Sequence, residues 1–499
     1  MRIHKKIRYT EDSKNLLSIS FLHDNLQRYV RFVLLTAFGF AIVFLIQIKF
    51  DIFIEVSLII FVLMVLLVLY SPMKGFSVFV FFAILSDTHY LYSFEGFKSI
   101  FTVKLLDLSL TDIVVLILLL RCFVDMLFKG KHKFKVSSWD RTFVTITSLF
   151  VLSAAYGLIN TPKFQFWIVD VKLFGFFVVS YFLVRFIFAD ITELRVLFEV
   201  IFLTFTAKLM VFSVFYFAKF GDVGPNVIQV TLSSDNVFYS LLLLFSLSVY
   251  FYSSNFKLRI FFGIITLLST FMIIFTFGRE IWVLAGFSLL LFYPFVEKKY
   301  RSRILRTTIL TVVIVMITAS AFYPSLFDYM SYNLRTFSLD LEPVEGEVSG
   351  SVRTIEWINV GNLLWDKHAI IQGRGMGATW RDIYIPLYKQ HDPFSYPTDE
   401  VEHGFTHMIS SMLLLKVGLL GSSIFWFSLL YSWLKNLSVA SEIKNFDRYT
   451  LLSLLIGCIP VFAKLTLVRI ALLGGIILGL VSTYFILKDE CPEAFGSER

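Results

Sequence analysis

Two arginines and two histidines have residue types suited to chemistry and lie at the edges of long apolar stretches. Arg279 lies in FTFGREIW, between two such stretches, and Arg353 opens the segment SVRTIEW. His403 and His407 lie in DEVEHGFTHMISSML, just before another apolar stretch. A charge in this setting is costly unless it is interfacial, paired or functional. A structural role competes for each arginine: Arg279 as a headgroup anchor, and Arg353 in an ion pair with Glu356 one helical turn away.

The two histidines are four residues apart, so they would share one face of a helix. Such a pair can bind a metal ion, but no third ligand is suitably spaced and the HExxH pattern is absent. A satisfied polar side chain at the interface is the simpler interpretation of either histidine alone. We therefore expect no metal site.

A glycine-rich segment, GRGMG at 373–377, contains a further arginine, Arg374. It lacks the GK[ST] ending of a phosphate-binding loop. It also lacks the third glycine and the preceding strand of a dinucleotide-binding fingerprint. A tight turn that ends a helix is therefore the favoured interpretation.

The composition places these residues in a membrane protein. Of 499 residues, 57% are hydrophobic and only 16% are charged, and the mean hydropathy is +0.76. A soluble globular chain has about a quarter of its residues charged. The net charge of +8 lies in short basic runs between apolar stretches, which is typical of cytoplasmic loops rather than of nucleic-acid binding. The three cysteines have no CxxC spacing, so no disulfide framework or zinc site is predicted.

The apolar stretches predict an all-α, polytopic bundle of about 12–14 transmembrane helices with one long external loop containing short helices. A span needs about 20 mostly apolar residues. On that basis the expected spans are 29–50, 52–70, 75–92, 108–128, 142–160, 166–189, 196–218, 237–253, 259–277, 281–296, 304–323, 405–434, 449–463 and 466–487.

The positions of Lys and Arg predict the orientation, because basic residues are concentrated in cytoplasmic loops. Three basic segments fall on one side of the expected bundle: the N-terminal tail, residues 129–141 and residues 298–306. That side is therefore expected to be cytoplasmic, with both termini on it. The predicted divisions are a tail at 1–28, helices at 29–323, an external loop at 324–404, closing helices at 405–487 and a tail at 488–499.

The expected external loop, 324–404, has its own pattern. It carries twelve acidic residues against six Lys or Arg, the reverse of the inner loops. Its segment SVRTIEWINVGNLLWDK has apolar residues at helical spacing and is expected to form a helix that lies on the membrane surface. A loop of this length is usually functional or disordered.

Taken together, GREIW, SVRTIEWINVGNLLWDKHAIIQGRGMG and HMISSMLLLKVGLLG resemble the O-antigen ligase and polymerase family of bacterial membrane proteins. The family pattern is an arginine after a mid-chain span, then an Arg-x-x-x-Trp helix leading to a Gly-x-Gly turn. A histidine and a Gly-x-x-Gly follow, here His407 with Gly418 and Gly421. The resemblance is strongest over 275–435. Met408 replaces the Asn usual in the family, and more spans precede the loop than in a typical ligase.

The resemblance implies a glycosyltransferase of the bacterial inner membrane, acting on its periplasmic face in the synthesis of lipopolysaccharide or exopolysaccharide. It would transfer a glycan from undecaprenyl pyrophosphate to a sugar hydroxyl, with inversion and without metal or other cofactor. Arg279 and Arg353 would bind the pyrophosphate and stabilise the charge on it as it leaves. His407 would accept the proton of the attacking hydroxyl.

The resemblance also implies a wider candidate site. The candidate substrate-binding residues are Arg279, Arg353, Arg374, Glu402 and His403. If His407 is not the base, the nearby carboxylates are the next candidates: Glu402, Glu400 and Asp399. The expected partners are the lipid-linked donor, a glycan or lipid A core acceptor and membrane lipid, and no nucleic acid.

Two alternatives stay open. Within the family, a polymerase extends a lipid-linked repeat, whereas a ligase transfers the glycan to lipid A core; the length and extra spans slightly favour a polymerase. From another class, a transporter or flippase of lipid-linked glycans is the rival. Transporters often have two related halves and polar residues at mid-membrane. Here no such halves are visible, and the polar residues are concentrated in one loop.

Overall fold

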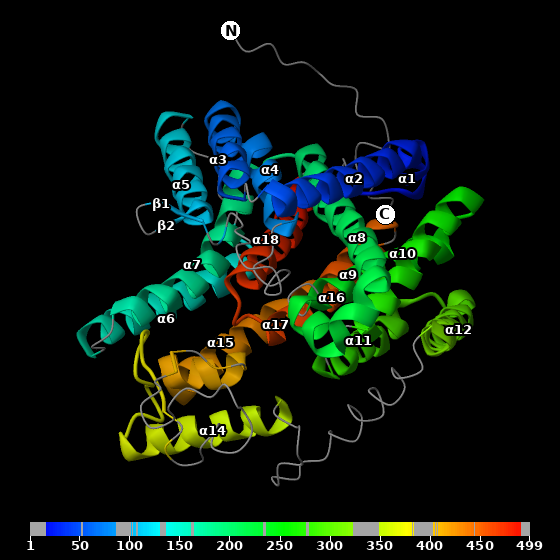
Figure 1. Cartoon of the computed structure of the whole chain (residues 1–499). Coiled ribbons are helices and arrows are strands. Elements are labelled where there is room, and N and C mark those ends of the chain that lie inside the picture. The colour runs from blue at the N-terminus through cyan, green and yellow to red at the C-terminus, as the bar shows by residue number, and fades with distance from the viewer. Residues whose placement is uncertain are drawn as a thin grey trace.

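The computed structural model is helical over nearly all of the residues that it describes (Figure 1). The structure describes residues 16–50, 53–85, 101, 103–105, 108–129, 136–160, 164–232, 236–275, 279–322, 349–381, 383, 403–404, 406, 408–443 and 445–490.

The elements follow one another along the chain with short connections in most places. They are α1 (Ile19–Asp24), α2 (Leu26–Phe50), α3 (Phe53–Tyr70), α4 (Pro72–Leu85), β1 (Lys104–Leu105), β2 (Leu108–Ser109), α5 (Leu110–Lys129), α6 (Ser138–Asn160), α7 (Phe164–Ile187), α8 (Ile191–Leu232), α9 (Asn236–Tyr252), α10 (Phe256–Phe275), α11 (Arg279–Phe292), the 3-10 turn η2 (Tyr293–Phe295), α12 (Lys298–Phe322), α14 (Ser349–Asp366), α15 (Ile409–Glu442), α16 (Asp447–Gly457), α17 (Ile459–Ala463) and α18 (Val468–Glu490).

Seven of the described helices are long and apolar enough to cross a bilayer. They contain Leu26–Val43, Ser138–Asn160, Phe164–Ile187, Ile191–Val214, Phe256–Ile274, Ile409–Glu442 and Val468–Lys488. Shorter apolar helices accompany them, among them α4 and α9. The helical form follows from the solvent, because in hydrocarbon every backbone N–H and C=O must be paired within the chain. The prediction of an all-α, multi-pass membrane protein is confirmed.

The expected single span at 449–463 is instead two helices, α16 and α17. Cys458 separates them, and Pro460 lies in the first turn of α17. Proline has no backbone N–H and is tolerated only where that donor has no helical partner, as in a first turn. One continuous helix through this position was therefore wrong.

Helix α18 lies near the centre of the bundle (Figure 1), and 94% of its most apolar segment, within Val468–Lys488, is buried. Small residues let α7 approach it closely. A Cβ at Gly475 would overlap the carbonyl oxygen of Phe177, and a Cβ at Gly479 would come 2.9 Å from the carbonyl oxygen of Tyr181. Small residues four apart are a common contact face between membrane helices, because they allow backbones to pack closely. These contacts hold α7, which carries part of the candidate site, against the core.

Polar contacts also tie the first described residues to the last helices. The backbone N–H groups of Leu16 and Leu17 donate to the Asp447 carboxylate at 2.9 and 2.7 Å. The Tyr484 hydroxyl donates to the same carboxylate at 2.8 Å. The N-terminal segment is therefore held against the start of α16 and the end of α18.

Candidate functional site

A three-residue ion cluster joins the start of α11 to the start of α14. Arg353 Nη1 lies 2.7 Å from Glu280 Oε2, and Lys464 Nζ forms an ion pair with the other oxygen, Glu280 Oε1. All three side chains are partly exposed, with relative exposures of 31%, 27% and 19% for Arg353, Glu280 and Lys464. Glu280 therefore bridges one cation from α14 and one from the end of α17.

The acidic partner of Arg353 is Glu280 on α11 and not Glu356 one turn along α14. Glu356 is instead buried in the body of its own helix, 1% exposed. The alternative of a local ion pair between Arg353 and Glu356 was therefore wrong. Glu356 is close to Arg353 in sequence, but the fold places the Glu280 carboxylate of α11 against the guanidinium.

Arg279 is the first residue of α11, directly before Glu280. Its backbone is described and its side chain is not. The contact of Glu280 with Arg353 thus brings the start of α11 next to the N-terminal half of α14. The candidate residues Glu402 and His407 lie outside the described residues, as do Asp399 and Glu400.

The expected helix SVRTIEWINVGNLLWDK is confirmed as α14, which runs from Ser349 to Asp366. Thirteen residues from Arg353 to Asp366 span roughly 20 Å of helix. Figure 1 shows α14 at the edge of the bundle beside α15. One helix therefore links the Glu280 cluster to the glycine-rich turn at 373–377.

The GRGMG segment is a tight turn, as expected. Gly373, Gly375 and Gly377 all have positive φ, at +71°, +82° and +84°. Such values are strained for residues that carry a Cβ. A Cβ at Gly373 would also overlap the backbone nitrogen of Gly418, so the turn requires glycine for space as well as for conformation.

The turn inserts into a break in α15. Gly418 has φ +70° and ψ −174° inside this helix. Backbone hydrogen bonds join the two segments across the break: Arg374 N–H to Leu415 O, Gly375 N–H to Lys416 O, Leu419 N–H to Ile370 O and Leu420 N–H to Ile371 O, at 2.7–3.1 Å. The backbone groups freed by the break are thus paired with the loop, which is what a non-helical segment at membrane depth requires.

A buried ion pair between α15 and α7 holds the same loop in place. Lys416 Nζ lies 2.6 Å from Asp170 Oδ2 on α7, and both side chains are almost fully buried. The ammonium also donates to the carbonyl oxygens of Ala378 and Gly404, at 2.5 and 2.9 Å. Asp170 Oδ2 accepts the Gly377 N–H at 2.6 Å. One cation and one carboxylate thus fix the loop to α7 and α15 at once.

Arg374 and His403 lie on either side of this loop. The half-buried Arg374 donates through Nη1 to the Thr379 carbonyl at 3.1 Å. His403 and Trp380 exchange two backbone hydrogen bonds of 3.0 and 2.9 Å. Their rings stack at 4.5 Å between centroids, with 28° between the planes. His403 is therefore held in place shortly before α15, four residues before His407 in the sequence.

Sequence reasoning missed Glu280, Lys464, Lys416 and Asp170. The signal for the last two was present, since each is a charge inside an apolar stretch, LLLKVGLL and FWIVDVKL. Charges at such positions almost always pair with one another. Their partnership could not be read from spacing, because Asp170 and Lys416 are far apart in the chain.

The candidate-site residues that the structure describes form two groups. The outer cluster comprises Arg353, Glu280 and Lys464, with Arg279 adjacent in the chain. The loop cluster comprises Arg374, Trp380, His403, Lys416 and Asp170. Within the described part of the chain, no three His, Cys, Asp or Glu side chains come together as a metal-binding set. The sequence matches no protein-family model and no curated protein.

Proposed function

We propose that this protein is an inner-membrane glycosyltransferase of the O-antigen ligase and polymerase type. It transfers a glycan from undecaprenyl pyrophosphate to a sugar hydroxyl, and we favour a polymerase of surface polysaccharide over a ligase that acts on lipid A core. The reaction takes place at the periplasmic face and inverts the sugar carbon. The activated pyrophosphate donor needs no metal, because it already carries a good leaving group.

The observation that carries the proposal is the contact between Arg353 and Glu280. It brings the Arg-x-x-x-Trp helix to the first turn of α11, which begins at Arg279. Two arginines required to bind one pyrophosphate must come from neighbouring backbones. A donor phosphate entering here would compete with Glu280 for Arg353, since guanidinium binds carboxylate and phosphate with the same fork.

The predicted orientation of the chain supports a site on the periplasmic side of the membrane. The positive-inside pattern places the starts of α11 and α14 and the end of α17 outside. Glu280, Arg353 and Lys464, which lie at those three places, contact one another. A lipid-linked donor presents its pyrophosphate at the headgroup layer of that face. His407 directly precedes Met408, the N-cap residue of α15. It would take the proton of the acceptor hydroxyl.

A transporter is the second candidate, because broken helices and buried charges often mark ion or substrate pathways. The break at Gly418 argues against that use. Its freed backbone groups are bonded to the loop at 370–375, and Lys416 is bonded to Asp170 and two carbonyls. The break therefore docks a loop and leaves little free capacity for an ion.

Deletion of the gene with analysis of surface glycans tests the proposal. A single repeat on lipid A indicates a polymerase, and loss of all polymer from lipid A with lipid-linked polymer accumulating indicates a ligase. Purified protein with a lipid-linked donor and acceptor should form the new glycosidic bond. In that assay Arg279→Lys should fail, because lysine keeps the charge but loses the two-pronged contact. Translocation of donor without bond formation would reject the proposal in favour of the transporter.

A further inference from the structure

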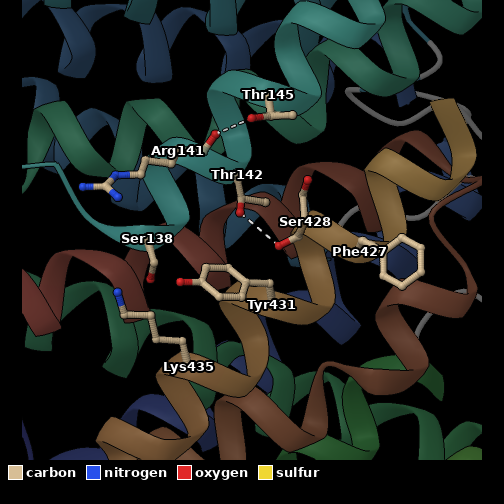
Figure 2. Close-up of a pocket in the computed structure, with 8 residues that line it drawn as sticks. All are labelled: Ser138, Arg141, Thr142, Thr145, Phe427, Ser428, Tyr431 and Lys435. Atoms are coloured by element: carbon tan, nitrogen blue, oxygen red, sulfur yellow. Dashed lines mark hydrogen bonds between the residues drawn. The ribbon is translucent and has the colours of Figure 1, made fainter. Parts of the chain in front are cut away.

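A pocket of about 340 Å³ lies between α6 and α15, far along both helices from the loop cluster. Its lining is Ser138, Arg141, Thr142, Thr145, Phe427, Ser428, Tyr431 and Lys435. Figure 2 shows the Arg141 guanidinium, the Lys435 ammonium and the Tyr431 hydroxyl extending to the same side. The pocket is lined by the first two turns of α6 and by the second half of α15.

The two cations of this pocket have no ion-pair partner among the described residues. Among the ion pairs and side-chain hydrogen bonds of the described residues, none involves the Arg141 guanidinium, the Lys435 ammonium or the Tyr431 hydroxyl. All three residues are exposed. Other cations of the described bundle do have carboxylate partners, such as Arg185 with Asp140 and Lys172 with Asp112. Two unpaired cations beside a free phenol form a surface that attracts an anion.

The walls of the pocket are held in place by other polar groups. The Thr142 hydroxyl donates to the Ser428 carbonyl at 3.0 Å, and the Ser432 hydroxyl donates to the Ser138 carbonyl at 3.0 Å. Asn436 donates to the Ser138 hydroxyl oxygen at 3.0 Å, which leaves that hydroxyl proton free to donate. The two helices are thus cross-linked beneath the pocket. The shape does not depend on Arg141 or Lys435.

An apolar stripe leads away from the cations along α15. Phe427, Ile424 and Leu420 are 71%, 37% and 58% exposed and follow the Tyr431 position at helical spacing. Such a stripe on a membrane helix faces lipid tails. A soluble anion would use the cations alone, whereas a phospholipid would use the cations and the stripe together.

The same end of both helices is the expected cytoplasmic side. Helix α6 begins at Ser138, within the basic segment 129–141, and Lys444 and Arg448 follow the end of α15 in the sequence. Basic pockets between membrane helices on that side bind the headgroups of anionic lipids. We propose that the pocket between α6 and α15 binds an anionic phospholipid of the inner leaflet. Its phosphate lies between Arg141 and Lys435, and an acyl chain lies against Phe427, Ile424 and Leu420.

The test uses the purified full-length chain and phosphatidylglycerol, with thermal stabilisation or native mass spectrometry as the readout of binding. The site variant is Arg141→Ala with Lys435→Ala, and the matched control is Lys257→Ala with Arg303→Ala. The control removes the same charge from exposed cytoplasmic-side residues on α10 and α12. Each basic residue near an anionic surface contributes enough for the site variant to bind roughly 30-fold more weakly. The control and the charge-preserving Arg141→Lys with Lys435→Arg should bind as the wild type does.

Three results would overturn the proposal. Equal loss in the control would make the effect one of general charge. Equal binding of phosphatidylcholine would show apolar adhesion without headgroup recognition. Equal binding of inorganic phosphate or glycerol phosphate, which lack acyl chains, would show a site for a soluble anion. An unchanged size-exclusion profile of the double alanine variant confirms that the chain is folded in each comparison.

Discussion

Arg353 of α14 lies 2.7 Å from Glu280 of α11, and Glu280 is also paired with Lys464 at the end of α17. This carboxylate joins three segments that are distant in the chain. It also lies directly after Arg279. Any movement of α14 that releases Arg353 from Glu280 changes the distance between the two arginines proposed to bind pyrophosphate.

Glu280→Gln is expected to lower glycan transfer strongly while changing the melting temperature little. The pair is partly exposed, and exposed ion pairs contribute only about 0–1 kcal/mol to folding. Its role would be to position α14. The measurement is initial transfer rate and thermal unfolding of the purified protein. Glu297→Gln is the matched control, since Glu297 pairs with the exposed Lys299 beyond the other end of α11. An equal loss of transfer in both variants would remove the positioning role.

His407→Ala is expected to abolish transfer in a protein that inserts normally. General-base catalysis contributes typically 10²–10⁴-fold, so the rate should fall by about that factor. His403→Ala should be milder, because His403 stacks on Trp380 and lies four residues before the family position. The rate of transfer from a lipid-linked donor is the readout. Full activity in His407→Ala would move the role of base to Glu402 or Asp399.

Lys416→Met is expected to destabilise the protein by about 3–5 kcal/mol, because it leaves the Asp170 carboxylate buried without its cation. The double variant Lys416→Met with Asp170→Asn should be more stable than the single variant. Asparagine is neutral and still offers an oxygen to the Gly377 N–H. Thermal unfolding in detergent measures both. The comparison variant is Lys172→Met, whose partner Asp112 is less buried, and it should cost less. A double variant less stable than Lys416→Met would contradict the argument.

Gly475→Ala is expected to destabilise the packing of α7 on α18 by roughly 1–3 kcal/mol, the usual cost of overpacking. The new Cβ would overlap the Phe177 carbonyl oxygen and the Ser180 hydroxyl oxygen. Gly175→Ala on α7 is the control, because nothing lies within 4 Å of its Cβ position. It should be neutral or stabilising, since alanine favours the helix. Equal melting temperatures for the two variants would show that the close contact is not required.

Transfer is expected to survive chelators of divalent metals. The proposed chemistry uses arginines to stabilise the leaving pyrophosphate and a histidine as base. The assay is the same donor and acceptor reaction in the presence of a chelator. Loss of activity that a divalent ion restores would instead favour a metal site at His403 and His407.

The sequence by itself determined that the chain is a multi-pass helical membrane protein, that 349–366 forms a helix and that GRGMG forms a turn. These features depend on local properties: apolar length matched to the bilayer, helical spacing and the conformational freedom of glycine. The error in the expected span at 449–463 also arose from local sequence. The interruption between α16 and α17 was missed because Pro460 stands in a run that is apolar on both sides.

Only the tertiary structure decided which distant residues meet. Glu356, near in sequence, was the alternative partner considered for Arg353, and Arg353 pairs instead with Glu280. Lys416 and Asp170, which the sequence analysis missed, together fix the loop at 370–378 to the bundle. Gly418 was noted only as part of a Gly-x-x-Gly motif, and its non-helical backbone interrupts α15 where that loop binds. Spacing along the chain describes one helix at a time, whereas a buried charge is stable only where the packing of several helices supplies its partner.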